Sequence, residues 1–122
     1  MKNDQIAAIF TELADLLEIQ EANPFRVRAY RSASRTISST AESMQTLLED
    51  GKDLTQFQGI GKDLARQIAE VIQTGQHEQL NELRNQVPQG VVDMLRIPGV
   101  GPKKVAIFFN QLKLESLEQL KA

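Results

Sequence analysis

The sequence predicts an all-α protein. Apolar residues recur at the three- and four-residue spacing of helices along most of the chain, and no stretch alternates apolar and polar residues as a half-buried strand does. A glycine-bounded turn occurs twice, and a helical pattern follows it each time. A chain of 122 residues forms one domain, or two small subdomains that share a core.

The composition excludes several classes of protein. There is no cysteine and only one histidine, so disulfides and thiolate zinc sites are excluded. We expect His77 to face solvent near a helix start. No apolar run approaches the roughly 18 residues of a membrane span, and no signal peptide precedes the chain, so we expect a cytoplasmic monomer with no membrane partner. The formal net charge of −2 argues against a generic polycation.

The first helix is predicted over 3–21, with Asn3 or Asp4 as its cap. Its apolar residues share one face, and its other face is acidic, so we expect that acidic face to be solvated. The acids are Asp4, Glu12, Asp15, Glu18 and Glu21.

The second helix, predicted over 24–38, differs in charge. Asn23 is a good N-cap and Pro24 suits the first helical position. The helix carries no acid, and Tyr30 lies among its arginines, while Ala29, Ala33 and Ile37 form the predicted buried stripe. Its arginines are Arg26, Arg28, Arg31 and Arg35, of which the last three share a face. The alternative is a solvated face. Solvated helix faces usually place glutamates among their arginines for i,i+4 pairing, and this helix has none, so the pattern favours an anion site.

The rest of the chain divides into short helices. Residues 39–42 fit a capping box for a helix that runs to Asp50, and Asp53 caps a short helix. Pro88 and Gly90 break the chain, so we place a subdomain boundary between 1–87 and 88–122. Further helices are predicted from Gly61 to Thr74, over 77–86, over 91–96, from Gly101 or Pro102 to Leu112, and over 117–121 with Ser116 as cap.

The two turns form an internal repeat. Residues 57–68 read FQGIGKDLARQI and residues 97–108 read IPGVGPKKVAIF, with the glycine pairs 40 residues apart. Glycine lets backbone approach a partner closely, and the N–H groups at the start of the next helix attract an anion such as phosphate. This is the helix-hairpin-helix pattern; two purely structural corners are the alternative. The predicted binding residues are Gly59, Ile60, Gly61 and Lys62 in the first turn, and Gly99, Val100, Gly101, Lys103 and Lys104 in the second.

Three segments, in this order and spacing, resemble one protein family. NPFRVRAYRSASRTI, FQGIGKDLARQIAEVIQTG and IPGVGPKKVAIFF resemble the N-terminal region of family X DNA polymerases, most closely the bacterial members of the polymerase beta lineage. The resemblance implies a helical lyase-type domain followed by a DNA-gripping helical subdomain, each with one hairpin, and a role in DNA repair. The family's palm, with three metal-binding aspartates, is absent from this chain, so a palm would lie elsewhere in a longer protein or in another chain.

The resemblance also implies particular sites. A Na⁺ or K⁺ ion would sit on the main-chain carbonyls of Thr55, Phe57 and Ile60 in the first hairpin, and of Leu95, Ile97 and Val100 in the second. A 5′-phosphate pocket maps onto Phe25, Arg26, Tyr30 and Asp63, and we add Arg28, Arg31 and Arg35 from the same helix. The family's lyase lysine is replaced by Gln67, whose amide cannot form a Schiff base.

These observations favour a sequence-nonspecific DNA-binding module for gapped, nicked or 5′-phosphate-bearing duplex, with no catalysis by this chain alone. One alternative is a 5′-deoxyribose-phosphate lyase that uses another lysine, of which Lys62 is nearest the first hairpin. The other is a protein-interaction domain that has lost its DNA contacts, a reading that the acidic pI favours. The sequence leaves open whether the chain is part of a longer polymerase.

Overall fold

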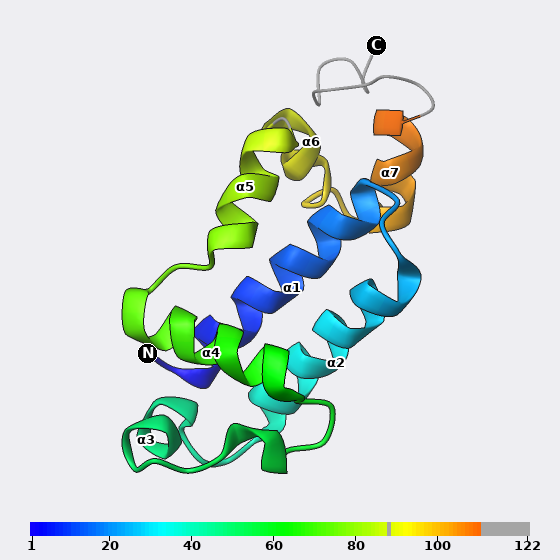
Figure 1. Ribbon diagram of the computed structural model, residues 1–122. Coiled ribbons are helices and arrows are strands. Elements are labelled where there is room, and N and C mark those ends of the chain that lie inside the picture. Colours follow the sequence, from blue (N-terminus) through cyan, green and yellow to red (C-terminus); the bar gives the residue numbers. More distant parts are fainter. Residues whose placement is uncertain (88, 111–122) are drawn as a thin grey trace.

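The computed structural model describes residues 1–87 and 89–110, and every regular element in these ranges is helical (Figure 1). The predicted all-α class is therefore confirmed. The elements are α1 (Asn3–Ile19), α2 (Pro24–Ser39), α3 (Met44–Glu49), the 3₁₀ turn η1 (Leu54–Gln56), α4 (Lys62–Thr74), α5 (Glu78–Gln86), α6 (Gln89–Met94) and α7 (Pro102–Asn110). None of the described helices is long and apolar enough to cross a membrane.

Helix α1 lies in the middle of the molecule and packs against α2, α4, α5 and α7 (Figure 1). Its buried residues recur at helical spacing, and Phe10 is fully buried at the centre of this stripe. The Phe10 ring stacks on Tyr30 of α2 with 6.1 Å between centroids, and meets the edge of the His77 ring at 5.7 Å. One side chain therefore joins three segments that are distant in sequence.

The start of α1 differs from the expectation. Lys2 occupies the N-cap position, and its N–H donates to Gln5 Oε1 at 2.9 Å. Asn3 does not cap α1. Its amide instead donates to the carbonyls of Thr40 and Glu42, at 3.2 and 2.8 Å, and its Oδ1 accepts from the Met44 N–H at 2.9 Å. Asn3 thus ties α1 to the loop before α3.

The capping box predicted at 39–42 was wrong. Helix α2 continues through Ser39, and α3 begins only at Met44. Ser43 caps α3 by accepting from the Thr46 N–H at 3.3 Å. The physical reason is that Asn3 binds the intervening loop and holds it outside any helix, a contact between residues about 40 positions apart.

Helix α2 begins as predicted, with Asn23 Oδ1 accepting from the Phe25 N–H at 2.9 Å. Its buried face is formed by Val27, Tyr30, Ala33, Ser34 and Ile37. Ala29, which was expected to be buried, is exposed. The Ser34 hydroxyl donates to the Ala7 carbonyl at 2.9 Å, so small residues bring α1 and α2 into close contact at this point.

Residues on both sides of the predicted subdomain boundary share one core, as expected for one domain or for two subdomains with a common core. Val91, Met94 and Val105 belong to the same buried apolar cluster as the α1 residues. Helix α7 packs directly on α1. The second hairpin is therefore held on the first part of the chain by apolar contacts. The predicted helix over 117–121, its cap at Ser116 and the end of the helix predicted to Leu112 lie outside the described residues.

We expect the buried Phe10 to dominate stability. Phe10→Ala removes a fully buried ring and should lower the free energy of unfolding by about 3–5 kcal/mol. Phe25→Ala is the matched control, because Phe25 is 72% exposed, and should change it by less than about 0.5 kcal/mol. Urea unfolding followed by circular dichroism measures both. Equal effects of the two substitutions would contradict a core centred on Phe10.

Candidate nucleic-acid interface

The two predicted hairpins have the same turn geometry. The Ile60 N–H donates to the Phe57 carbonyl at 3.2 Å, and the Val100 N–H donates to the Ile97 carbonyl at 3.0 Å. The glycine before each donor has a left-handed backbone, with φ of +82° at Gly59 and +81° at Gly99. Both features fit a type II turn, in which positive φ at the third position requires glycine. The repeat seen in the sequence is thus a repeat of structure.

The first hairpin is fixed on α2 by its own backbone. A Cβ placed on Gly59 would lie 2.9 Å from Ser32 Oγ. The Thr36 hydroxyl donates to the Gln58 carbonyl at 3.0 Å, and Ile60, 3% exposed, reaches the core. Gly59 was expected to let the backbone approach DNA. In the structure, Gly59 also lets the hairpin lie close against α2, and its predicted contact with DNA stays a prediction.

The second glycine of each pair has no such internal role. Gly61 has ordinary extended backbone, with φ of −86° and ψ of −174°. A Cβ on Gly61 or Gly101 would meet no atom within 4 Å. Gly61 also serves as N-cap of α4 without any side-chain cap. The N–H groups of the first turn of α4 are therefore left without a capping side chain, and a missing Cβ leaves room beside them.

The structure brings the predicted 5′-phosphate residues of two helices around one cavity. Arg26 and Tyr30 come from α2, whereas Lys62, Asp63 and Gln67 come from α4, and the cavity has a volume of about 440 Å³. Its other lining residues are Ala29, Gly61 and Leu64. The Arg26 guanidinium lies 5.9 Å from the centre of the Tyr30 ring. The Tyr30 hydroxyl donates to Gln79 Oε1 at 3.3 Å.

The other predicted members of the pocket lie elsewhere. Phe25 is exposed, with the Arg28 guanidinium 5.1 Å from its ring centre. Arg28 and Arg31 line a second cavity of about 640 Å³. Arg35 lines a third, of about 490 Å³. The helical period places Arg26 on a different side of α2 from the other three arginines, so the predicted set divides among three cavities.

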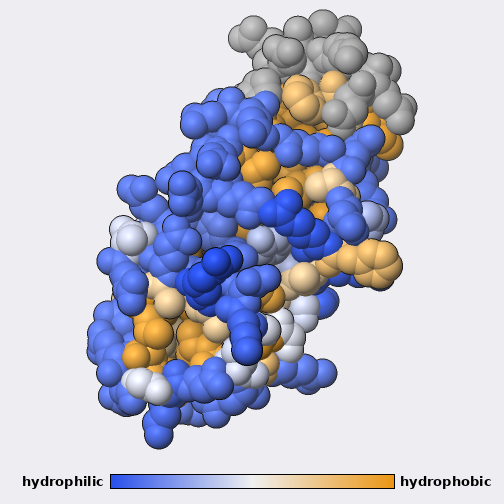
Figure 2. Space-filling model, viewed as in Figure 1, coloured by the Kyte–Doolittle hydropathy of each residue, from blue (hydrophilic) through white to orange (hydrophobic). Residues whose placement is uncertain are grey.

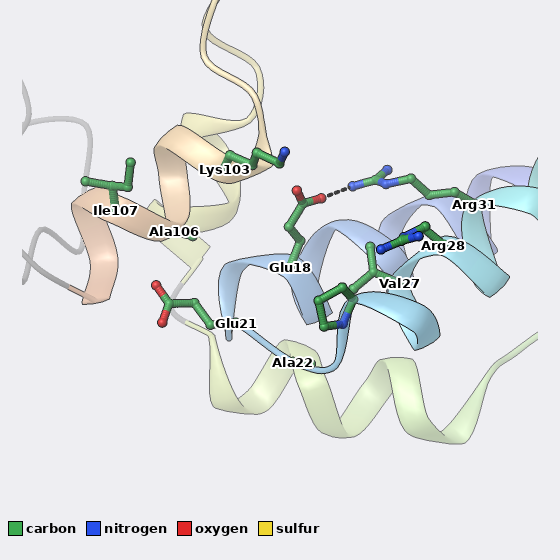
Figure 3. Close-up of a pocket in the computed structure, with 10 residues that line it drawn as sticks. Glu18, Glu21, Ala22, Val27, Arg28, Arg31, Lys103, Ala106 and Ile107 are labelled. Carbon is green, nitrogen blue, oxygen red and sulfur yellow. Dashed lines mark hydrogen bonds and ion pairs between the residues drawn. The ribbon is translucent and has the colours of Figure 1, made fainter.

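Figure 3 shows the second cavity, where Lys103 of α7 and the arginines of α2 face a common gap. Arg31 is neutralised there, since its guanidinium binds Glu18 at 2.5 Å and Asp15 at 2.9 Å. The prediction of a solvated acidic face on α1 was therefore wrong for these two acids. Burial raises the pKa of the Asp15 carboxyl even though Arg31 binds it.

Ion pairs separate the arginines into two groups. Within the described residues, Arg31, Arg66, Arg84 and Arg96 each have a carboxylate within 4.0 Å, and Glu12 of α1 is the partner of Arg84. The arginines that remain without an ion pair are Arg26, Arg28 and Arg35, and all of them belong to α2. Figure 2 shows a face that is mostly hydrophilic, with its most hydrophilic residues near the middle. Among the described residues, the arginines without an ion pair are thus all on one helix, while unpaired lysines such as Lys62 and Lys103 lie on other helices.

The predicted lysines lie beside these cavities. Lys62 lines the Arg26 cavity and Lys103 lines the Arg28 cavity. Lys104 Nζ donates to the Gly99 carbonyl at 3.1 Å, inside the second hairpin. No group of three or more histidine, aspartate or glutamate side chains in the described ranges could hold a metal ion. The main-chain carbonyls predicted to hold Na⁺ or K⁺ include those of Phe57 and Ile97, which each accept the hydrogen bond of their turn.

The expectation that His77 faces solvent was wrong. His77 is 3% exposed, and its Nδ1 accepts from the Leu80 N–H at 3.2 Å as the N-cap of α5. Nε2 must then carry the proton that is donated to Gln67 Oε1 at 2.7 Å. Burial lowers the pKa of the imidazole. Gln67 therefore has a structural role, since it links α4 to the start of α5, which sequence periodicity alone did not reveal.

Comparison with known proteins identifies the family to which this helical fold with two glycine turns belongs. The helix-hairpin-helix domain family matches residues 1–77, so the chain belongs to this family. The chain is also similar to the DNA polymerase/3′-5′ exonuclease PolX of Bacillus subtilis (strain 168), with 31% identity over 121 residues. This match covers 99% of the chain and 20% of the relative, so the chain spans about a fifth of that protein's length. The predicted resemblance to bacterial family X polymerases is confirmed.

Because His77 is the one histidine of the sequence, it can be isolated in a titration. The folded protein favours the neutral ring, and an unfolded histidine titrates near ~6.5. Stability should therefore be complete above pH ~6.5 and should fall as the pH drops through the lowered pKa of the folded state. Urea unfolding from pH 7.5 to 5.5 measures this loss. His77→Asn keeps a capping side chain and should remove the slope in this window; an unchanged slope would contradict the assignment.

Proposed function

We propose that this chain is a sequence-nonspecific DNA-binding module that holds gapped, nicked or 5′-phosphate-bearing duplex, as DNA repair requires. The observation that carries the proposal is the pair of glycines, Gly61 and Gly101, that the fold itself does not need. Each stands at the start of a helix that has a lysine in its first turn, Lys62 in α4 and Lys103 in α7. The relative's name, a DNA polymerase, supports the same partner.

The hairpins would bind the DNA backbone through main-chain groups. A phosphate oxygen approaches an N–H group only where no side chain intervenes, and glycine at the N-cap provides that access. Lys62, Lys103 and Lys104 would add charge, and Na⁺ or K⁺ on the predicted carbonyls would bridge backbone and phosphate. Contacts of this kind position a duplex without reading its bases, so we propose little sequence preference.

The cavity between α2 and α4 would take the 5′-phosphate. Arg26 has no ion pair in the described part of the chain, and arginine binds phosphate oxygens in a bidentate manner. Lys62 adds a second positive charge. Asp63 opposes an anion, but its carboxylate lies 3.7 Å from Arg66, which offsets part of its charge. The Tyr30 hydroxyl would donate to the phosphate in place of its present hydrogen bond to Gln79 Oε1.

A lyase is the second candidate, because the cavity contains a primary amine. Of the residues that line it, Lys62 alone has one, and it shares the cavity with Arg26 and Tyr30. Attack of a neutral Lys62 amine on the aldehyde of an abasic sugar would form a Schiff base and release water. Borohydride would trap that species as a protein–DNA adduct. An adduct that disappears in Lys62→Ala would support the lyase; an adduct that survives every single lysine change would reflect nonspecific amine reactivity.

The remaining proposals concern a polymerase palm, the localisation and the oligomeric state of the protein. Polymerisation would need a palm in the same or another chain, and the described residues show no metal-binding cluster of their own. We propose a cytoplasmic monomer, because DNA is the proposed partner. A protein-interaction domain remains the alternative, and DNA binding that does not depend on salt, or no binding at low salt, would favour it.

The glycines provide the direct test. Gly61→Ala and Gly101→Ala should lower stability by no more than about 1 kcal/mol, the cost of alanine at a helix N-cap, because neither added Cβ meets an atom of the described residues. Both should nevertheless weaken binding to a gapped duplex several-fold. Gly59→Ala should instead lower stability by roughly 1–2 kcal/mol, because its φ is positive. Gly75→Ala is the matched control, with φ of +75° and open space, and should affect stability alone. Fluorescence anisotropy and urea unfolding measure the two effects.

If Gly61→Ala and Gly101→Ala fold and bind the gapped duplex with full affinity, the hairpins are structural corners and the proposed function is wrong.

The terminal phosphate is tested separately. A gapped duplex with a 5′-phosphate should bind more tightly than the same duplex with a 5′-hydroxyl, and Arg26→Ala should remove the difference. Tyr30→Phe tests the hydroxyl while keeping the ring that stacks on Phe10. Arg84→Ala is the control for loss of one arginine, because its guanidinium is bound to Glu12 and it does not line the Arg26 cavity. Equal affinity of the unmutated protein for both ends would exclude the pocket.

A further inference from the structure

We propose that the hollow around Arg35 is a second phosphate site, which takes an internal phosphodiester of the DNA strand that crosses the first hairpin. This inference rests on the proposed function and assigns it a contact that neither the hairpin pattern nor the family resemblance supplies. It also separates Arg35 from the terminal-phosphate residues with which the sequence had grouped it.

The lining of this hollow distinguishes it from its neighbours. It has a volume of about 490 Å³, and none of the described residues that line it carries a carboxylate. By contrast, Asp63 lines the Arg26 cavity, and Glu18 and Glu21 line the Arg28 cavity. The lining residues are Ser32, Arg35, Thr36, Ser38, Ser39 and Gln58. Among the three cavities that contain an arginine of α2, this one therefore offers an anion positive charge without a competing acid from the described residues.

The donors in the hollow are free of internal partners. Within the described residues, the Arg35 guanidinium makes no ion pair, and neither it nor the hydroxyls of Ser32 and Ser38 make a hydrogen bond to another side chain or to backbone. The hydroxyls of Thr36 and Ser39, in contrast, already donate to carbonyls at 3.0 and 3.2 Å. A guanidinium flanked by two available hydroxyls matches the acceptor oxygens of a phosphodiester.

The end of α2 would oppose an anion, because the last carbonyls of a helix carry its negative pole. This effect is reduced here. The Thr36 carbonyl accepts from the Thr40 N–H at 3.1 Å, from the Thr40 hydroxyl at 2.6 Å and from the Ser39 hydroxyl at 3.2 Å. Three donors thus satisfy the Thr36 carbonyl in this last turn of α2.

The hollow lies at the opposite end of the hairpin from the Arg26 cavity. The hairpin runs antiparallel to α2, since Gln58 bonds to Thr36, Gly59 lies against Ser32, and Gly61 shares a cavity with Arg26. Arg26 and Arg35 are nine residues apart, which is about 13–14 Å along a helix. A strand that follows the hairpin would therefore place its terminal phosphate at Arg26 and an internal phosphate at Arg35.

The experiment compares single arginine variants on two gapped duplexes, one with a 5′-phosphate and one with a 5′-hydroxyl, by anisotropy at several salt concentrations. Arg35→Ala should weaken binding to both duplexes equally, by about tenfold, and reduce the slope of log K against log salt by about 1. Ser38→Asp, which places a carboxylate in the hollow, should weaken both in the same way. Arg84→Ala removes the same charge from α5 and should leave both unchanged.

The outcomes separate the inference from the proposed function. If the unmutated protein binds DNA but Arg35→Ala and Ser38→Asp bind with unchanged affinity and slope, the hollow holds no phosphate. If Arg35→Ala loses only the preference for the 5′-phosphate, Arg35 belongs to the terminal site and the assignment to an internal phosphate is wrong. If the unmutated protein shows no salt-dependent DNA binding, the proposed function fails, and the inference falls with it.

Discussion

The burial of one apolar stripe on α1 is the constraint on which the rest of the structure depends. Phe10, at its centre, contacts both Tyr30 of α2 and His77 before α5. Through His77 and its bond to Gln67, the same contact positions α4, the helix that follows the first hairpin. Helix α7 of the second hairpin packs on α1 as well. Both hairpins and the basic helix thus owe their positions to a single central helix.

The same helix also selects which arginines remain available. Asp15 and Glu18 of α1 neutralise Arg31, and in the described part of the chain the arginines of α2 that point elsewhere have no acid within ion-pair distance. In the described residues, Arg26, Arg28 and Arg35 thus keep a charge that no carboxylate within 4.0 Å neutralises, although the formal net charge of the protein is −2.

The two glycines of the first hairpin differ in their backbone conformation and in what surrounds them. Gly59 is required by a left-handed backbone and by its contact with Ser32, so its role is internal. Gly61 has neither feature, since its backbone is extended and a Cβ built on it would meet no atom of the described residues within 4 Å. The sequence alone does not distinguish these two glycines. The structure does, through the distance from a Cβ built on each glycine to its nearest neighbours.

The sequence by itself determined the elements that depend on local chemistry: the all-α class, the cap at Asn23, the two glycine turns and the absence of an amine at Gln67. Tertiary structure decided which face of each helix is covered and by what. The burial of His77, the exposure of Ala29 and the neutralisation of Arg31 all follow from contacts between separate helices. Periodicity predicts which residues of a helix share a face. The residues that cover that face are far away in the sequence, so only the folded structure shows which they are.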